Sequence, residues 1–241
     1  MIYPSWYGAW IVAGIIFFVV CLRRNSFFSS VVSYEQTIDL VFFSIMVGVG
    51  SGRVLFMIDC WDTVDSWTFF FRLNEPGFSV LGSVVGVFCA LIVQLYFLKV
   101  PFLKTMDSIA LYVPLLHVCG RIGCFCVGCC YGVPCLYPWA VTYTQEKALA
   151  PLHVALHPTQ LYSALSHGIL FVILFFCYKR FKKPGIIACL YGIGISVERF
   201  FVDFLRDDRI LIAGAFSSSQ IVAFGIGMMA SIGIIMVWRQ E

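Results

Sequence analysis

Residues 117–132 read HVCGRIGCFCVGCCYG, and this stretch decides how the rest of the chain is interpreted. An apolar segment ends here at Arg121, which is surrounded by glycines and cysteines and has no acidic residue within a turn or two in sequence. An arginine at membrane depth costs on the order of 3 kcal/mol on insertion scales, so a nearby group must compensate its charge. A lipid phosphate is one candidate, because the planar guanidinium group donates two parallel hydrogen bonds to phosphate oxygens.

The composition is that of a polytopic membrane protein. Of 241 residues, 61% are hydrophobic and only 12% are charged, and the mean hydropathy is +0.92, which excludes an ordinary soluble domain. A spanning helix needs about 20 mostly apolar residues. The apolar stretches are 7–22, 39–58, 78–98, 159–178, 184–204 and 217–238, with a further one, fourth in order, that starts near residue 106 and leads into the central motif. We therefore expect an all-α membrane protein with seven transmembrane helices, forming a single polytopic domain over residues 1–241.

The basic residues predict the orientation of these spans. Nine Lys and Arg residues fall on one side of the alternating spans, four fall on the other side, and three lie within spans. By the positive-inside rule, the N-terminus is outside and the C-terminus is cytoplasmic. Tyr7, the loop 129–158 and the ends of the second, fourth and sixth spans then share the outer leaflet, where we expect the functional site. The first span has no basic segment before it, so we expect a retained helix.

Three arginines lie at membrane depth: Arg53, Arg121 and Arg199. One interpretation is that each pairs with an acid or extends its head group to the interface. Arg53 has Asp39 and Asp59 as possible partners, and Arg199 has Asp203 one helical turn away. The alternative, which we favour for the arginines of the fourth and sixth spans, is a clamp for an anionic head group.

His157 opens the run HPTQLY at the start of the fifth span. A histidine at the outer interface can act as a general base near neutral pH, or can simply be a polar residue at a helix start. Gln160 and Tyr162 in the same run can donate hydrogen bonds to phosphate or glycerol oxygens. His117, inside the fourth span, is more typical of a packed helix face.

The cysteines cluster in one part of the chain: Cys124, Cys126, Cys129, Cys130 and Cys135. A zinc site would use the C-x-x-C pair of Cys126 and Cys129, but a second pair at finger-like spacing is missing, so we expect no metal and no cofactor. A disulfide of Cys130 with Cys135 or Cys60 is a further interpretation if the compartment is oxidising.

A reactive thiol is a third interpretation of the same cysteines. A nucleophilic cysteine needs a lowered pKa, which a neighbouring arginine provides. Cys124 and Cys129 lie close to Arg121 in sequence and are the candidates. Without such a role, these cysteines would be small packing residues.

Six short elements follow one another along the chain: 6–8 (WYG), 52–53 (GR), 82–86 (GSVVG), 120–123 (GRIG), 157–162 (HPTQLY) and 199–206 (RFFVDFLR). In this order they resemble the prolipoprotein diacylglyceryl transferase family, over nearly the whole length of the chain. The resemblance implies the fold with seven spans and a location in the bacterial cytoplasmic (inner) membrane, with several passes.

The resemblance also implies an activity. The family transfers a diacylglyceryl group from phosphatidylglycerol to the lipobox cysteine of a prolipoprotein, forming a thioether and releasing glycerol 1-phosphate. The implied partners are phosphatidylglycerol, or another anionic phospholipid, and the prolipoprotein signal peptide. We expect a monomer that does not bind nucleic acid.

Several site residues are implied by the same resemblance. Arg121 and Arg199 match the family's essential arginines, and we expect them to bind the phosphate. Asp203 stands where the family has a glutamate and is expected to orient Arg199, while His157 or Tyr7 assists proton transfer. Further substrate-binding residues are expected to be Gly120, Gly123, Gln160, Arg206, Cys124 and Cys129.

The chain departs from the family pattern within the motifs themselves. Leu81 replaces a histidine, Cys124, Val127 and Cys129 replace two asparagines and a glutamate, and Val133 replaces an arginine. These departures leave two alternatives beside the leading hypothesis. One is a divergent paralogue that transfers a group from an anionic phospholipid to another acceptor through a cysteine. The other is a catalytically silent lipid-binding membrane protein.

Overall fold

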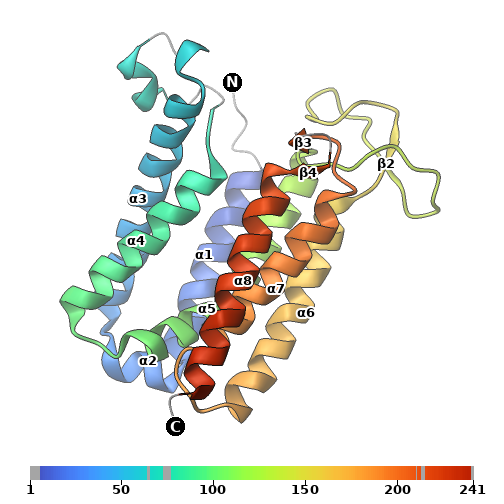
Figure 1. The fold of residues 1–241 in the computed structure, drawn as a ribbon. Helices are drawn as coiled ribbons and strands as arrows, with labels where there is room; N and C mark the ends of the chain where they lie inside the picture. The colour runs from blue at the N-terminus through green and yellow to red at the C-terminus, as the bar shows by residue number, and fades with distance from the viewer. Residues whose placement is uncertain (1–5, 64–65, 73–76, 210, 213–214, 240–241) are drawn as a thin grey trace. The chain divides into compact units, whose positions relative to one another are not determined.

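The computed structural model describes residues 6–63, 66–72, 77–209, 211–212 and 215–239, and most of these residues are helical (Figure 1). The chain forms two compact units, one of Met1–Asn25 with Leu103–Glu241 and the other of Ser26–Phe102. The expectation of an all-α membrane protein is confirmed by helices long and apolar enough to cross a bilayer.

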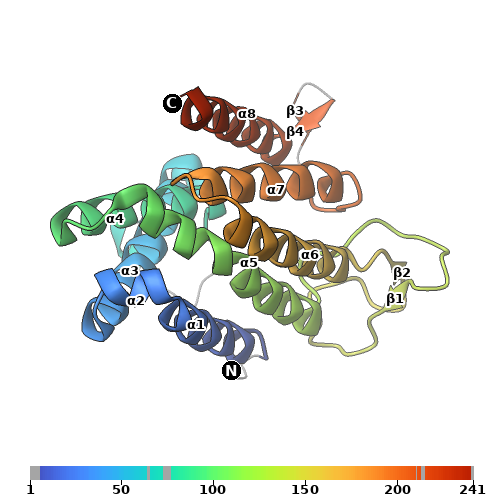
Figure 2. The same ribbon diagram turned by 90° about the horizontal axis from the view of Figure 1, so that it is seen from below.

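The first unit contains the helices α1 (Trp6–Arg24), α5 (Phe102–Val127), α6 (Thr159–Arg180), α7 (Ile186–Asp203) and α8 (Ser218–Arg239). Within this unit, viewed from below in Figure 2, they follow one another in chain order. α7 packs against both α6 and α8. Leu111 of α5, Leu174 of α6 and Ile187 of α7 are buried against one another and form the apolar centre of the unit.

Small residues let α7 and α8 approach closely. A Cβ atom placed on Gly192 would lie 3.1 Å from the Cβ of Ala230, and one on Gly233 would lie 2.8 Å from the sulfur of Cys189. Such seams are typical of helices that pack within a membrane, where close contact replaces the hydrophobic effect.

Two short antiparallel strand pairs lie at the same end of the first unit (Figure 1). β1 (Val141–Thr142) pairs with β2 (Ala155–Leu156) in the long loop after α5, and β3 (Leu211–Ile212) pairs with β4 (Phe216–Ser217) between α7 and α8. They give the loop backbone hydrogen-bond partners where the helices end.

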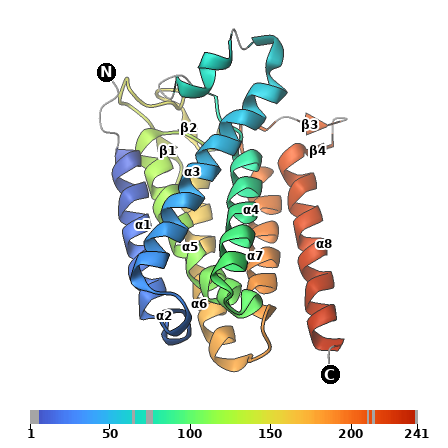
Figure 3. The same cartoon turned by 90° about the vertical axis from the view of Figure 1, so that its left-hand side faces the viewer.

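The second unit contains α2 (Ser26–Val31), α3 (Tyr34–Asp59), the 3-10 turns η1 (Trp61–Thr63) and η2 (Trp67–Phe71), and α4 (Val80–Leu98). α3 and α4 form an antiparallel pair (Figure 3). α3 begins earlier than the predicted span because Ser33 and Gln36 form a reciprocal capping box. Its glycine Gly48 faces Ser83 of α4, again allowing a close approach.

Arg53 of α3 does not follow the predicted pairing with Asp39 or Asp59. Its guanidinium group donates to the backbone carbonyls of Gly77 and Arg72, and it lies over the ring of Phe69 at 4.7 Å from the centroid. The side chain is buried, so backbone dipoles and an aromatic face compensate its charge.

The seven predicted spans are only partly confirmed. Six of the described helices, all those of at least 18 residues except α7, satisfy length and hydropathy requirements for a membrane span. α7 forms as predicted, but it carries Glu198, Arg199 and Asp203 in its last turns, and these charges lower its hydropathy.

Asp107 fixes the start of α7. The carboxylate of this buried α5 residue accepts hydrogen bonds from the backbone N–H groups of Gly185, at 2.7 Å, and Ala188, at 2.8 Å. It therefore acts as an N-cap supplied by another helix, because it satisfies free N–H groups and places a negative charge at the positive end of the helix dipole.

Replacing this cap should destabilise the unit. We expect Asp107→Ala to lower the free energy of unfolding by about 1–2 kcal/mol, the range for loss of a helix cap. Unfolding of the purified protein in mixed micelles measures this change. The control is Glu146→Ala, which removes an exposed loop acid. Equal stability of the two variants would show that the Asp107 cap contributes nothing.

Candidate functional site

The arginine and cysteine motif lies on the last turns of α5. The helix continues to Val127. Arg121 and Cys124 are therefore part of α5 and not of the loop that follows it. α5 packs closely on α1: a Cβ atom on Gly123 would lie 3.1 Å from the ring of Tyr7, and one on Gly120 would lie 3.6 Å from Ile11. The two predicted glycines therefore bring Tyr7 beside the motif.

A tight turn follows α5. The N–H groups of Gly128 and Cys129 bond to the carbonyl of Cys124 at 2.9 and 3.1 Å. Gly128 and Cys130 have φ angles of +77° and +57°, in the left-handed region. A left-handed conformation suits glycine but costs about 1–2 kcal/mol for another residue, so its use at Cys130 requires compensation from the surroundings.

The compensation comes from hydrogen bonds on both sides of the turn. Gly132 donates its N–H to the carbonyl of His157 at 3.0 Å, and Val133 donates to the carbonyl of Leu205 at 2.9 Å. The turn is thereby held between the start of α6 and the end of α7. This arrangement brings the predicted motifs around residues 121, 157 and 199 into one region of the unit.

Two buried side chains of α6 hold the carbonyl groups of the adjacent cysteines. Thr159 donates to the carbonyl of Cys130, and Gln160 donates to that of Cys129, both at 2.7 Å. Gln160 is 1% exposed, and its Oε1 atom has no hydrogen-bond partner among the described residues. We expected Gln160 to contact lipid oxygens; in the structure its N–H group positions the cysteine turn.

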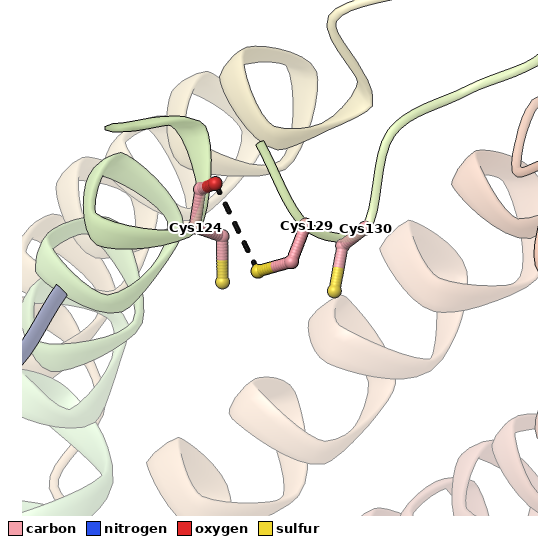
Figure 4. Close-up of side chains that lie close together, drawn as sticks. All are labelled: Cys124, Cys129 and Cys130. Carbon is pink, nitrogen blue, oxygen red and sulfur yellow. Dashed lines mark hydrogen bonds between the residues drawn. The ribbon is translucent and has the colours of Figure 1, made fainter. Parts of the chain in front are cut away.

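The turn gathers three thiols. The sulfur atoms of Cys124, Cys129 and Cys130 lie within 4.8 Å of one another. The side chain of Cys129 points toward Cys124, while those of Cys124 and Cys130 point in the same direction as each other (Figure 4). Cys130 is not part of a disulfide, so the disulfide considered for it is not formed in the structure. Cys126 is exposed and lies outside this group, so the C-x-x-C pair is not the one that the fold brings together.

The electrostatic environment distinguishes two of these thiols. Hydrogen bonds from Cys124 and Cys129, followed by the charges of Arg206 and Arg121, lower the pKa of Cys130 below its usual range. The hydrogen-bonded thiols of Cys124 and Cys130 raise the pKa of Cys129. Of these two thiols, Cys130 is therefore the one that loses its proton more readily.

Arg206 lies beside the cluster and is buried. It binds both carboxylate oxygens of Asp208, at 2.8 and 2.5 Å, and also forms a hydrogen bond to Cys130. Burial opposes its charge, but the bonds to Asp208 and Cys130 raise the pKa of Arg206 above its usual range. The predicted site residue Arg206 is thus a fixed cation of the cysteine turn.

Arg199 and Asp203 form the pair predicted from their spacing. Nη2 of Arg199 lies 3.8 Å from Oδ1 of Asp203 and donates to the hydroxyl of Ser219 at 2.9 Å. Asp203 is 1% exposed and also accepts a hydrogen bond from Ser217. The carboxylate is therefore positioned from two sides, and it holds Arg199 at the end of α7.

The start of α8 supplies these serines. Ser217 caps the helix by accepting from the N–H of Gln220 at 3.1 Å, while the Gln220 side chain accepts from the N–H of Ser217 at 2.9 Å. This capping box was missed in the sequence, although Ser followed three residues later by Gln is its signature. It links the N-terminus of α8 to the acid of α7.

Arg121 remains the least neutralised of these cations. None of the described acids forms an ion pair with it, whereas its charge acts on Cys130 and on Arg199. Two guanidinium groups that repel each other are stabilised by an anion placed between them.

His157 belongs to an aromatic group at the outer side of the turn. Its Nδ1 atom lies 3.1 Å from the hydroxyl of Tyr162, which accepts a hydrogen bond from Trp139 at 2.7 Å. The ring of Tyr137 packs on His157 and stacks on Trp139. The contacts of the His157 ring are with this group, and only its backbone bonds to the cysteine turn.

Comparison with known proteins gives one consistent result. The family model described as prolipoprotein diacylglyceryl transferase matches residues 2–239. The chain is similar to the phosphatidylglycerol–prolipoprotein diacylglyceryl transferase of Clostridium tetani, with 33% identity over 90% of this chain and 86% of the relative. It is also 31% identical to transferase 2 of Clostridium perfringens, over 80% and 75%, and 31% identical to the transferase of Haemophilus influenzae strain PittEE, over 85% and 76%.

The packing around the turn predicts a sharp difference between two glycines. A Cβ atom on Gly132 would lie 2.6 Å from the carbonyl oxygen of Leu205 and 2.7 Å from the Cβ of His157, whereas one on Gly168 meets nothing within 4 Å. We expect Gly132→Ala to lower the free energy of unfolding by about 1–3 kcal/mol, as overpacking does. Gly168→Ala, in the interior of α6, should be neutral or stabilising by up to about 1 kcal/mol.

Thermal and denaturant unfolding in detergent compare the two alanine variants. If Gly132→Ala is as stable as Gly168→Ala, the turn does not lie between residues 157 and 205 as described.

Proposed function

Because the chain belongs to the prolipoprotein diacylglyceryl transferase family, we propose that it transfers a diacylglyceryl group from phosphatidylglycerol to a prolipoprotein's lipobox cysteine. The products are a thioether-linked lipoprotein and glycerol 1-phosphate. The chain is a transferase by family, and its helices suit the bacterial inner membrane. The relatives carry the name of this activity, and the chain covers most of their length.

The proposal includes a specific membrane topology. α7 would be the seventh span, with its charged last turns at the outer face, the N-terminus outside and the C-terminus cytoplasmic. The support is the excess of basic residues on one side of the alternating spans. We also propose that residues 1–241 act as one membrane domain in a monomer, without a nucleic-acid partner.

The observation that carries the proposal is the pair of Arg121 and Arg199. Both lie in the first unit, their charges act on each other, and Arg121 has no ion-pair partner among the described acids. A phosphodiester supplies the missing anion, and the planar guanidinium groups donate to its oxygens. The same contacts strengthen as negative charge grows on the departing phosphate, which is how such a clamp accelerates a reaction.

The reaction needs one bond to form and one to break. The thiolate of the acceptor cysteine attacks the glyceryl carbon next to the phosphate, the carbon–oxygen bond breaks, and its electron pair leaves with glycerol 1-phosphate. The acceptor must lose its proton first, since the thiolate is the nucleophile. We propose that His157 or Tyr7 assists this proton transfer and that Gly120, Gly123 and Gln160 shape the space around the substrate.

A second candidate function is transfer to an acceptor other than a lipobox cysteine. The observation that favours it is the replacement of polar family residues by Cys124 and Cys129, which changes the surface beside Arg121.

Ser163 and Glu198, hydrogen-bonded at 2.5 Å between α6 and α7, are further polar groups of this unit that sequence reasoning missed.

The direct test supplies both substrates. Purified protein with phosphatidylglycerol and a lipobox peptide should form a thioether-linked peptide, detected by mass spectrometry, and the same peptide with serine in place of cysteine should not react. No product, under conditions in which the Clostridium tetani relative gives product, would contradict the proposal. Lipid binding without product would instead support a silent lipid-binding protein.

The arginine clamp predicts a loss of turnover on substitution. Removing one preorganised donor to a developing charge typically costs about 10²–10³-fold in kcat, so we expect Arg121→Ala and Arg199→Ala to lose at least this much. Lysine at either position should restore little, because it lacks the planar fork. Arg239→Ala, an exposed arginine at the end of α8, is the control. Unchanged kcat in both alanine variants would exclude the clamp.

The position of Asp203 predicts an indirect effect. Asp203→Asn keeps the size of the side chain but removes the charge opposite Arg199, so we expect a fall in kcat of about tenfold, or ~1.4 kcal/mol. Ser217→Ala, which removes only one hydrogen bond to this carboxylate, should have a smaller effect. Steady-state kinetics with separate kcat and KM values distinguish a misplaced arginine from lost stability. A larger effect of Ser217→Ala would contradict this role of Asp203.

A further inference from the structure

We propose that Cys124, Cys129 and Cys130 bind a Zn²⁺ ion whose open fourth position takes the thiol of the acceptor cysteine. This inference rests on the proposed transferase function for the identity of the acceptor, while the metal site itself rests on the geometry of the cluster. It changes the expectation that the chain uses no metal, because the sequence pattern pointed to Cys126, which lies outside the cluster.

The spacing of the three sulfur atoms suits a soft ion. Thiolates around tetrahedral zinc lie about 3.8 Å apart, because each Zn–S bond is about 2.3 Å long. The three sulfurs lie within 4.8 Å of one another before any ion draws them together (Figure 4). The three thiols are therefore already gathered to within about 1 Å of the spacing that a zinc ion requires.

The backbone holds the thiols in this arrangement at a cost. Cys130 adopts a left-handed φ of +57°, and its thiol points in the same direction as that of Cys124, beside the thiol of Cys129. Buried Thr159 and Gln160 fix the carbonyl groups of both residues. A strained residue that its surroundings hold in place indicates a functional constraint. Bringing three thiols together to bind one metal ion is such a constraint.

The charges around the cluster fit a thiolate-bound metal. Three thiolates give a zinc centre a net negative charge, and a fourth thiolate increases it. Arg121 and Arg206 both act on Cys130, although Arg206 also binds Asp208. Positive charges outside the ligand shell offset such a centre and keep the ligands in place.

Three protein ligands leave one position open, as in catalytic zinc sites. A thiol that enters this position loses its proton to solvent or to a base and is held as thiolate. Its sulfur then attacks the glyceryl carbon, the carbon–oxygen bond breaks, and the electron pair leaves with glycerol 1-phosphate between the arginines. The thioether product is neutral and a weaker ligand, so it leaves the metal without any change in oxidation state.

Cobalt titration of the reduced protein in detergent tests the metal site independently of turnover. We expect one Co²⁺ per chain with a sulfur-to-cobalt charge-transfer band, bleached by Zn²⁺. Cys124→Ser, Cys129→Ser and Cys130→Ser should each lose the band, while Cys126→Ser and Cys135→Ser keep it. Thermal unfolding identifies any variant that fails to fold, and Zn²⁺ should raise the Tm of the wild type but not of the folded cluster variants.

Two results would overturn the metal site. One is the absence of a stoichiometric band in the fully reduced wild type, and the other is a band that survives in the cluster variants, which would mark adventitious metal on other cysteines.

A lipobox peptide tests the open position. Adding it to the cobalt-loaded protein should strengthen the charge-transfer band, because a fourth thiolate binds, and the serine peptide should have no effect. If the charge-transfer band is unchanged after addition of the cysteine peptide, the metal does not bind the acceptor thiol. If the peptide binds the metal but no thioether forms with phosphatidylglycerol, the proposed transferase function fails while the zinc site stands. Full transfer by chelated protein and by Cys124→Ser would overturn the zinc proposal and leave the transferase.

Discussion

The candidate site depends on one constraint, which is that the backbone leaving α5 must find partners for its N–H and C=O groups where a membrane helix ends. The turn meets this constraint because its backbone N–H groups donate hydrogen bonds to the carbonyl oxygens of Cys124, His157 and Leu205. These bonds determine the path of the chain, and the path determines the direction of two adjacent thiols. The chemistry of the site therefore begins with main-chain hydrogen bonds rather than with the side chains themselves.

The same residue type plays opposite parts in the two units. Arg53 is saturated by carbonyl groups and an aromatic ring, so its charge serves the fold. Arg121 has no comparable acid among the described residues, and Arg199 is only partly neutralised, by Asp203 at 3.8 Å. An uncompensated charge is costly in a membrane, and it is retained where it meets a ligand. This contrast, and not the presence of arginine alone, separates structural from functional cations.

Much of the fold follows from hydropathy, because a run of apolar residues leaves a helix as the main solution in lipid. The Arg199–Asp203 pair also follows from sequence, since residues four apart share a helix face. The cysteine group does not. Cys126 forms a C-x-x-C pair with Cys129, whereas Cys130 is adjacent to Cys129 and has a left-handed φ that the sequence pattern does not predict. Thr159 and Gln160, which hold the carbonyl groups of this turn, lie about thirty residues away in sequence. The angle therefore cannot be predicted from the residues next to Cys130.

The small-residue seam between α7 and α8 has a consequence for how α7 is placed. α7 carries three charged residues and gains less from lipid than its neighbours do. Its partner α8 supplies both the close packing surface and the serines that bind Arg199 and Asp203. Stable placement of α7 therefore depends on α8, which follows it in the chain. The arginine and the acid at the end of α7 gain their serine partners only when α8 has packed beside them.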